Sequence, residues 1–231
     1  MGVTVKPDLK KLIAIAALVV FVALPILFYA LGDFPRRSVL KEAISLLTLV
    51  ALSLMLGQFF LARSNMGVIE LYNLRRIRTV HAVIAYFAVS WLLLHPFLVV
   101  VPRFFEAGIE PWDAMTMMLT TYSSTGIALG LAAWVLLLVL TVTAIFRIRL
   151  IKALHTKYPR WRHFHGMLSI ALTTFALLHA ISLGRHTDTP MATMLIVVSV
   201  VGVAMLLRMY FPQRAGAPEP PSAPNVREQA R

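Results

Sequence analysis

The sequence predicts an all-α integral membrane protein, a bundle of six transmembrane helices with both termini in the cytoplasm. Hydrophobic residues make up 59% of the 231 residues and charged residues only 14%, and the mean hydropathy is +0.78. These values lie far from those of a soluble domain. A helical crossing takes about 20 residues, so the chain is long enough for six spans joined by short loops.

Six apolar runs account for the predicted spans. They lie at about 12–32, 43–62, 80–101, 126–146, 166–183 and 191–210. The first run follows a basic start, MGVTVKPDLKK, but it exceeds the ~7–15 residues of a signal-peptide core, and we predict a helix there. We expect the membrane domain to occupy residues 1–211, with its core at 70–183, and the Pro- and Ala-rich tail, 212–231, to be disordered.

Lys and Arg are distributed unevenly over the segments that join the predicted spans. Seventeen of the 22 lie at the N-terminus, in 63–80, in 147–165 and in the tail from Arg208, and five lie in the alternate segments. Because basic residues accumulate in cytoplasmic loops, we expect both termini in the cytoplasm and the chain in the bacterial inner (plasma) membrane. The net charge of +12 then reflects topology and contact with anionic lipid headgroups rather than nucleic-acid binding.

The sequence argues against several kinds of chemistry. It contains no cysteine, which excludes disulfides, iron–sulfur clusters and thiolate catalysis within this chain. Its ten Asp and Glu residues fall in loops, at span ends or in the tail, so a buried carboxylate relay is not expected. It contains neither G-x-G-x-x-G nor a P-loop motif, and electrons would therefore come from another molecule.

Four histidines occur in two predicted spans with the same spacing. His81 and His95 are fourteen residues apart in the third span, and His165 and His179 are fourteen apart in the fifth. At ~100° per residue, this spacing falls about 40° short of four turns, so both members of a pair lie on nearly one helix face, roughly 21 Å apart. Because the third and fifth spans run in the same direction, His81 can face His165 and His95 can face His179.

Two facing imidazole pairs in a helical bundle are the ligand set of two bis-histidine b-type haems. We predict that His81 and His165 hold an inner haem and that His95 and His179 hold an outer one. A zinc or copper site is less favoured, because two ligands leave such an ion short of partners. The alternative is that the histidines are packed structural residues or mark a proton path. Four nearby arginines are suited to haem propionates, although the positive-inside rule alone would also place them there: Arg75, Arg76, Arg78 and Arg162.

The remaining histidines and the aromatic residues carry weaker predictions. We interpret His155 and His186 as surface residues and expect His163 to point to another helix face than His165. Three aromatic side chains lie between the two predicted haem levels: Phe87, Trp91 and Phe175. Such side chains more often serve packing than form an electron path. The external 102–125 loop is predicted either to cover the outer haem or to dock an acceptor.

Residues 125–180 carry a specific resemblance to a known family. A Thr-Gly pair opens the fourth span, Trp161 and Arg162 shortly precede His165, and Leu178-His179 ends the fifth span; the third span has Arg75-Arg76 before His81, and Leu94-His95. With these features the chain, over about 70–183, resembles the ferric reductase-like transmembrane domain family. This family includes ferric reductases, the membrane halves of NADPH oxidases and the haem subunit of a bacterial methionine sulfoxide reductase system.

The resemblance implies a six-helix haem cytochrome that passes electrons outward from a cytoplasmic donor. The full-length reductases and oxidases continue into an FAD and NAD(P)H domain that this sequence lacks, so the implied donor is a separate flavin reductase, carrying FAD or FMN, or a quinone. The acceptor would be one such as ferric iron. One alternative is a haem-bearing membrane anchor that delivers electrons to a periplasmic partner such as methionine sulfoxide reductase. A second is a haem-free transporter or assembly factor.

Overall fold

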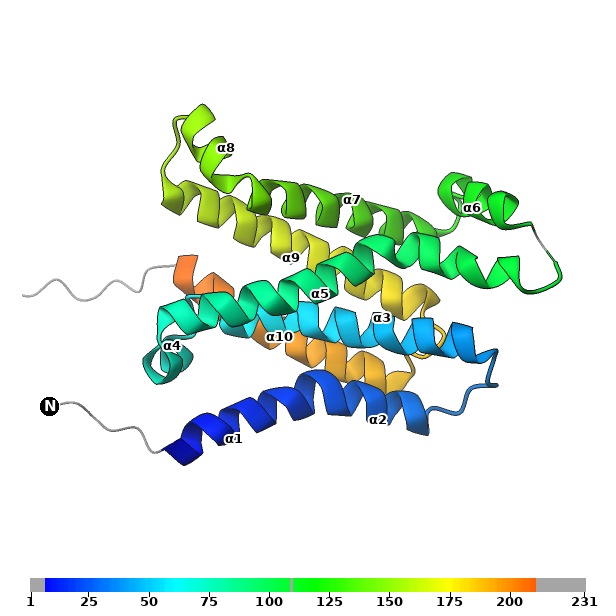
Figure 1. Cartoon of the computed structure of the whole chain (residues 1–231), viewed down its shortest axis with the longest axis horizontal. Helices are drawn as coiled ribbons and strands as arrows, with labels where there is room; N and C mark the ends of the chain where they lie inside the picture. The colour runs from blue at the N-terminus through cyan, green and yellow to red at the C-terminus, as the bar shows by residue number, and fades with distance from the viewer. Residues whose placement is uncertain (1–6, 109, 211–231) are drawn as a thin grey trace, which may run out of the picture.

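The computed structural model describes residues 7–108 and 110–210 and shows a bundle of six long helices (Figure 1). Each is long and apolar enough to cross a membrane: Asp8–Leu31, Val39–Leu61, Leu74–Phe104, Thr125–Ile145, Tyr158–Leu183 and Thr189–Tyr210. The predictions of an all-α fold and of six spans are therefore confirmed, and the chain is a multi-pass integral membrane protein. The predicted disordered tail, 212–231, lies outside the described residues.

Several of the spans are built from more than one helical segment. The first consists of α1 (Pro7–Leu18), a π-helical turn, η1 (Val19–Ala23), and α2 (Leu24–Leu31), where Pro25 has no backbone N–H to donate. The second is α3 (Val39–Gly57) with η2 (Gln58–Leu61), and the third is α5 (Leu74–Val100) with η3 (Val101–Phe104). The last three are α7 (Thr125–Ile145), α9 (Tyr158–Leu183) and α10 (Thr189–Tyr210).

Three short helices lie in the connections and distinguish the two ends of the bundle. α4 (Met66–Tyr72) and α8 (Arg147–Ala153) lie at the same end as the beginning of α1 and the end of α10, and α6 (Pro111–Thr120) lies at the other (Figure 1). We call these the α8 end and the α6 end. The segments richest in Lys and Arg thus share the α8 end. The 102–125 segment is largely helical, in η3 and α6, rather than the loop predicted from its sequence.

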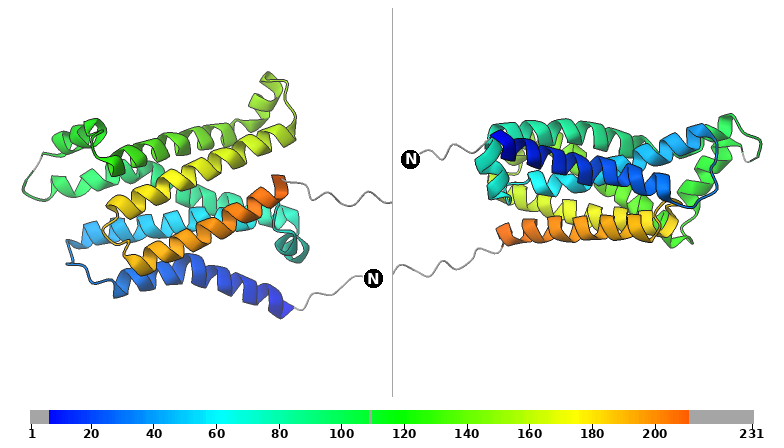
Figure 2. Two further views of the ribbon diagram at one scale, coloured as in Figure 1. Left: turned by 180° about the vertical axis from the view of Figure 1, so that it is seen from behind. Right: turned by 90° about the horizontal axis from the view of Figure 1, so that it is seen from below.

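The core of the bundle is formed by apolar side chains from the inner helix faces. α3 is the most buried span, and α10 packs against α9, α3 and α2 on the side away from α7 (Figure 2). Outward faces are also apolar, with Val83, Val135 and Val200 all more than half exposed. Apolar residues both inside and outside are typical of a bundle surrounded by lipid. The core includes Leu52, Leu56, Ala88, Leu137, Leu172, Met191 and Leu195.

Candidate functional site

The two helices that carry the paired histidines stand apart from each other. α7 packs along α9 and α3 packs along α5, and these are the closest helix pairs, whereas α5 and α9 are not among the closely packed pairs of the described helices. The space between α5 and α9 is therefore filled by side chains and a cavity rather than by close backbone contact. This arrangement leaves room for a group held from both sides.

A cavity of about 470 Å³ lies between these helices toward the α6 end, and both His95 and His179 line it. Its volume is within the range of ~300–1,000 Å³ that is usual for sites of small molecules and cofactors. The predicted juxtaposition of His95 and His179 is thus present in the structure. Most of the remaining wall is apolar, with leucines from three helices: Leu49 and Leu52 of α3, Leu137 of α7 and Leu172 of α9.

His179 is held in one tautomer by the backbone of α7. Its Nδ1 lies 2.8 Å from the carbonyl oxygen of Gly126. Because a carbonyl oxygen only accepts hydrogen bonds, Nδ1 must carry the proton and donate it. The lone pair of the neutral ring is then on Nε2, the atom that a metal would bind, and the carbonyl bond fixes the ring orientation.

His95 is held in the same tautomer by Thr48 of α3. The Thr48 hydroxyl donates its only hydrogen to the carbonyl oxygen of Ile44, at 2.7 Å, and accepts from Nε1 of Trp91, at 3.0 Å. The Nδ1 of His95 lies 3.3 Å from the same hydroxyl oxygen, which has only an acceptor position left. Nδ1 of His95 therefore donates, and its Nε2, like that of His179, keeps a free lone pair.

A pair of glycines brings α7 close to His179. A Cβ at Gly130 would lie 2.5 Å from His179 Nδ1, and a Cβ at Gly126 would lie 2.4 Å from Cγ of Leu183. The two glycines form a G-x-x-x-G pattern, which allows helix backbones in membranes to approach closely. The pattern explains why the carbonyl of Gly126 can reach the imidazole.

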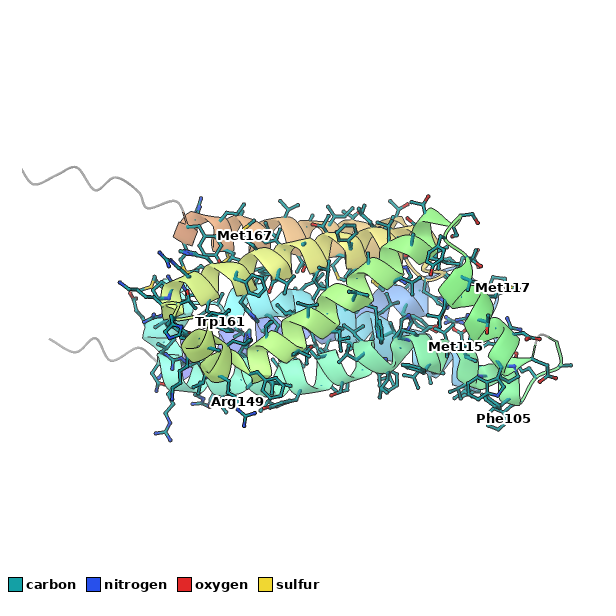
Figure 3. All side chains as sticks on the ribbon, turned by 90° about the horizontal axis from the view of Figure 1, so that it is seen from above. Phe105, Met115, Met117, Arg149, Trp161 and Met167 are labelled. Atoms are coloured by element: carbon teal, nitrogen blue, oxygen red, sulfur yellow. The ribbon has the colours of Figure 1, made fainter. Side chains whose placement is uncertain are left out.

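The second histidine pair lies toward the α8 end. His81 lies in the first turns of α5 and His165 in the first turns of α9, and the His165 ring stacks on Trp161 with centroids 5.0 Å apart at 24°. Three buried polar atoms there have no hydrogen-bond partner, namely Nδ1 of His165, Nε1 of Trp161 and Nε of Arg162. Buried donors without partners are rare in proteins, and a cluster of them fits a site for a polar group. Figure 3 shows Trp161 and Arg149 at this end of the bundle and Phe105 and Met117 at the other.

The other predicted site residues are placed as follows. Arg162 is half-buried near the inner histidine pair, whereas Arg75, Arg76 and Arg78 are exposed at the start of α5. Trp91 is held by its bond to Thr48. Phe175 packs against the core, and the Phe87 side chain is 44% exposed.

The three histidines outside the two pairs differ in their surroundings. His155 is exposed, as expected, and so is His163, which contacts the Tyr210 ring at 4.7 Å. The interpretation of His186 as a surface residue was wrong, because it is only 3% exposed. Its ring packs against Tyr29, near the end of the first span, and Phe34, between the first two spans. These two side chains cover a loop whose polar composition suggested exposure.

Thr48, Gly126 and Gly130 were not singled out as site residues from the sequence. The G-x-x-x-G spacing could have indicated that α7 packs closely on another helix at the two glycines. Thr48 gave none, because a hydroxyl 47 residues from His95 is connected to it only by the packing of α3 on α5.

The fold and the site together define a polytopic helical membrane protein in which His95 and His179 line one cavity and His81 and His165 lie nearer the α8 end. Among the described residues no three His, Asp or Glu side chains gather as a metal site. The chain belongs to the family of the ferric reductase like transmembrane component, whose model matches residues 47–176. The match includes Thr48, His81, His95 and His165 and ends three residues before His179.

One relative is an uncharacterized protein of Archaeoglobus fulgidus, 36% identical over 164 residues, which are 71% of this chain and 87% of the relative. No solved structure matches the chain.

Proposed function

We propose that this protein transfers electrons across the plasma membrane through two b-type haems, one between His81 and His165 and one between His95 and His179. The family assignment indicates a membrane redox function. The donor in this proposal is cytoplasmic, a separate flavin reductase carrying FAD or FMN, or a quinone. The acceptor lies at the α6 end, on the outer side, and is one such as ferric iron. The excess of Lys and Arg in the segments at the α8 end supports this orientation.

The observation that carries the proposal is the state of His95 and His179. Both line one cavity, and both donate from Nδ1 to a fixed oxygen, so both have Nε2 free to bind a metal. In a purely structural histidine, a free nitrogen at a cavity wall has no function. A bis-histidine haem site, in contrast, requires a free Nε2 on each of its two histidines. A haem bound there would supply a one-electron redox centre.

The chain's own residues then orient and isolate the site. Thr48 and the carbonyl of Gly126 fix the two ring planes and strengthen the ligands by accepting from Nδ1. The leucines of α3, α7 and α9 keep water from the cavity wall, which affects the potential of any redox group between them. At the inner pair, the partnerless donors of Trp161 and Arg162 are suited to propionate oxygens.

Vesicles loaded with a reductant test the proposal directly. The purified chain is reconstituted with dithionite and a flavin inside, and ferrous iron formed from ferric citrate outside is followed with a chromogenic chelator. We expect reduction by the wild type, almost none by His95→Ala, and an unchanged rate for His155→Ala, which removes an exposed histidine. A red protein that reduces no soluble ferric chelate but co-purifies with a methionine sulfoxide reductase would instead support the anchor function. A colourless protein would support the haem-free alternatives.

A further inference from the structure

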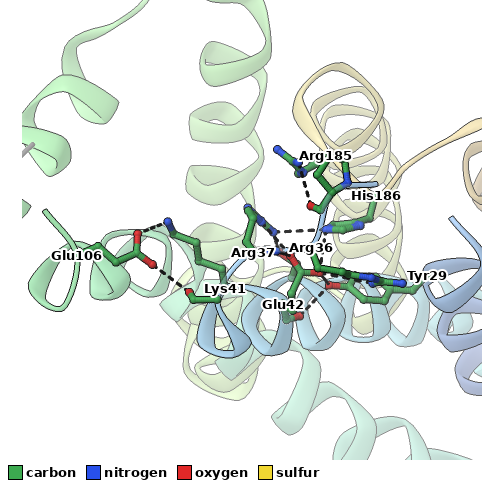
Figure 4. Close-up of polar contacts among 11 residues, drawn as sticks. Tyr29, Arg36, Arg37, Lys41, Glu42, Glu106, Arg185 and His186 are labelled. Atoms are coloured by element: carbon green, nitrogen blue, oxygen red, sulfur yellow. Dashed lines mark hydrogen bonds and ion pairs between the residues drawn. The ribbon is translucent and has the colours of Figure 1, made fainter. Parts of the chain in front are cut away.

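The α6 end of the cavity is polar, in contrast to its apolar walls. Arg37 and Ser45, near the start of α3, and Arg185 and His186, between α9 and α10, line this part of the cavity. We call these four residues the polar end. Figure 4 shows Arg37, Arg185 and His186 beside Glu42 and Tyr29. A cavity with an apolar body and one polar end is shaped for a ligand with an apolar body and one polar edge.

The polar end carries more positive than negative charge. Arg37 and Arg185 come together there with one carboxylate, Glu42, which Arg37 Nε approaches to 3.0 Å. Lys41 does not compensate Glu42 further, because it is paired with Glu106. Burial lowers the pKa of His186, against the opposing effect of Glu42, so this ring is neutral near pH 7. A second anion would therefore be favoured.

Two side chains of the polar end have a nitrogen atom without a hydrogen-bond partner among the described residues. Arg37 donates from Nε to Glu42 and from Nη2 to Ser45 Oγ, at 2.6 Å, and to His186 Nε2, at 3.4 Å. No described residue accepts from its Nη1. Nε2 of His186 lies 3.4 Å both from Arg37 Nη2 and from Glu42 Oε2, and its Nδ1 is buried without a hydrogen-bond partner. Tyr29 and Phe34 hold the ring in place, with centroid distances of 4.3 and 5.0 Å.

We propose that the polar end is a carboxylate-binding site, in which Arg37 Nη1 donates to a carboxylate, Arg185 adds positive charge, and the His186 ring lies against the Arg37 guanidinium. A planar guanidinium matches a planar carboxylate, and charge-assisted bonds of this kind are among the strongest in proteins. The carboxylate has two possible sources. One is a propionate of a haem held by His95 and His179, and this source rests on the proposed function. The other is a free acceptor such as a citrate chelate of iron, which needs no haem in the cavity.

The test compares full-length protein with three variants. Arg37→Gln removes the main donor, and His186→Phe removes both ring nitrogens, including the Nε2 that lies 3.4 Å from Arg37 Nη2, but keeps an aromatic ring between Tyr29 and Phe34. Arg36→Gln is the matched control, because Arg36 neighbours Glu42 but does not line the cavity. Each protein is measured in a redox titration of its haem spectrum and by calorimetric titration with citrate.

If a haem propionate occupies the site, Arg37→Gln and His186→Phe lower the midpoint potential of one spectral component more than Arg36→Gln does, and citrate does not bind. If the site takes free carboxylates, the wild type and Arg36→Gln bind citrate, and the other two variants bind it about tenfold more weakly or worse. If the potentials of all three variants shift equally or not at all and the wild type does not bind citrate, the carboxylate site is refuted. A protein without haem would refute the proposed function, while the citrate titration would still decide this site.

Discussion

Replacing Gly130 with alanine tests whether the close approach of α7 to α9 positions His179. A Cβ at this position would lie 2.5 Å from Nδ1, 2.6 Å from Cε1 and 3.1 Å from Cγ of the imidazole. Ordinary van der Waals contact begins near 3.4 Å, so the ring must move by roughly 0.9 Å or the helices must separate. Either movement lengthens the 2.8 Å bond from Nδ1 to the carbonyl oxygen of Gly126.

The expected cost follows from these contacts. Overpacking a filled site costs ~1–3 kcal/mol, and loss of the hydrogen bond adds about 1 kcal/mol. The higher helix propensity of alanine raises the free energy of unfolding by up to ~1 kcal/mol and offsets part of this cost. We therefore expect Gly130→Ala to lower the free energy of unfolding by about 1–3 kcal/mol and to weaken or abolish binding of the haem that His179 would hold.

Thermal unfolding in detergent, followed by circular dichroism, and haem content per chain measure these two effects. Gly67→Ala is the matched control, because its nearest neighbouring atom would be Asn65 Oδ1, at an ordinary 3.9 Å. This variant should keep the wild-type haem content and an equal or slightly higher melting temperature. A Gly130→Ala protein indistinguishable from Gly67→Ala in both measurements would refute the reasoning.

Three further predictions concern other parts of the structure. Thr48→Val removes the acceptor shared by Trp91 and His95 and leaves two partly buried donors unpaired. It should lower the free energy of unfolding by ~1–3 kcal/mol in total, and an unchanged chemical-denaturation midpoint would contradict this. Because burial lowers the pKa of His186 below its ordinary 6.5, the unfolded chain binds more protons near and below that pH. The contribution of neutral His186 to stability should therefore be complete above about pH 6.5 and decrease as the pH falls, and His186→Phe should flatten the pH dependence of the melting temperature between about pH 6.5 and 5. His81→Ala should remove one spectral component and leave the other, whereas loss of both would contradict two separable sites.

The span positions could be predicted because they depend on local composition. Each apolar run is long enough by itself, and the fourteen-residue spacing places two histidines on one helix face whatever the neighbouring helices do. The expected approach of His95 to His179 needed only the parallel direction of two spans, and in the structure both residues line one cavity.

The parts that could not be predicted depend on contacts between distant segments. His186 is buried by Tyr29 and Phe34, which lie about 150 residues earlier in the chain. The polar loop around it, GRHTDTP, therefore led to the wrong prediction that His186 is exposed. The tautomer of His95 depends on a hydroxyl of α3. Such contacts become visible only when the helices are placed against one another.

Haem content per chain, read from the reduced minus oxidised spectrum, tests the central claim most directly. The account predicts about two b-type haems in the wild type and about one in each of His81→Ala and His95→Ala. It also predicts that His81→Ala resembles His165→Ala and that His95→Ala resembles His179→Ala in the spectral component lost. A wild-type protein that is colourless when produced in haem-sufficient cells, or one in which the four variants fail to fall into these two pairs, would contradict it.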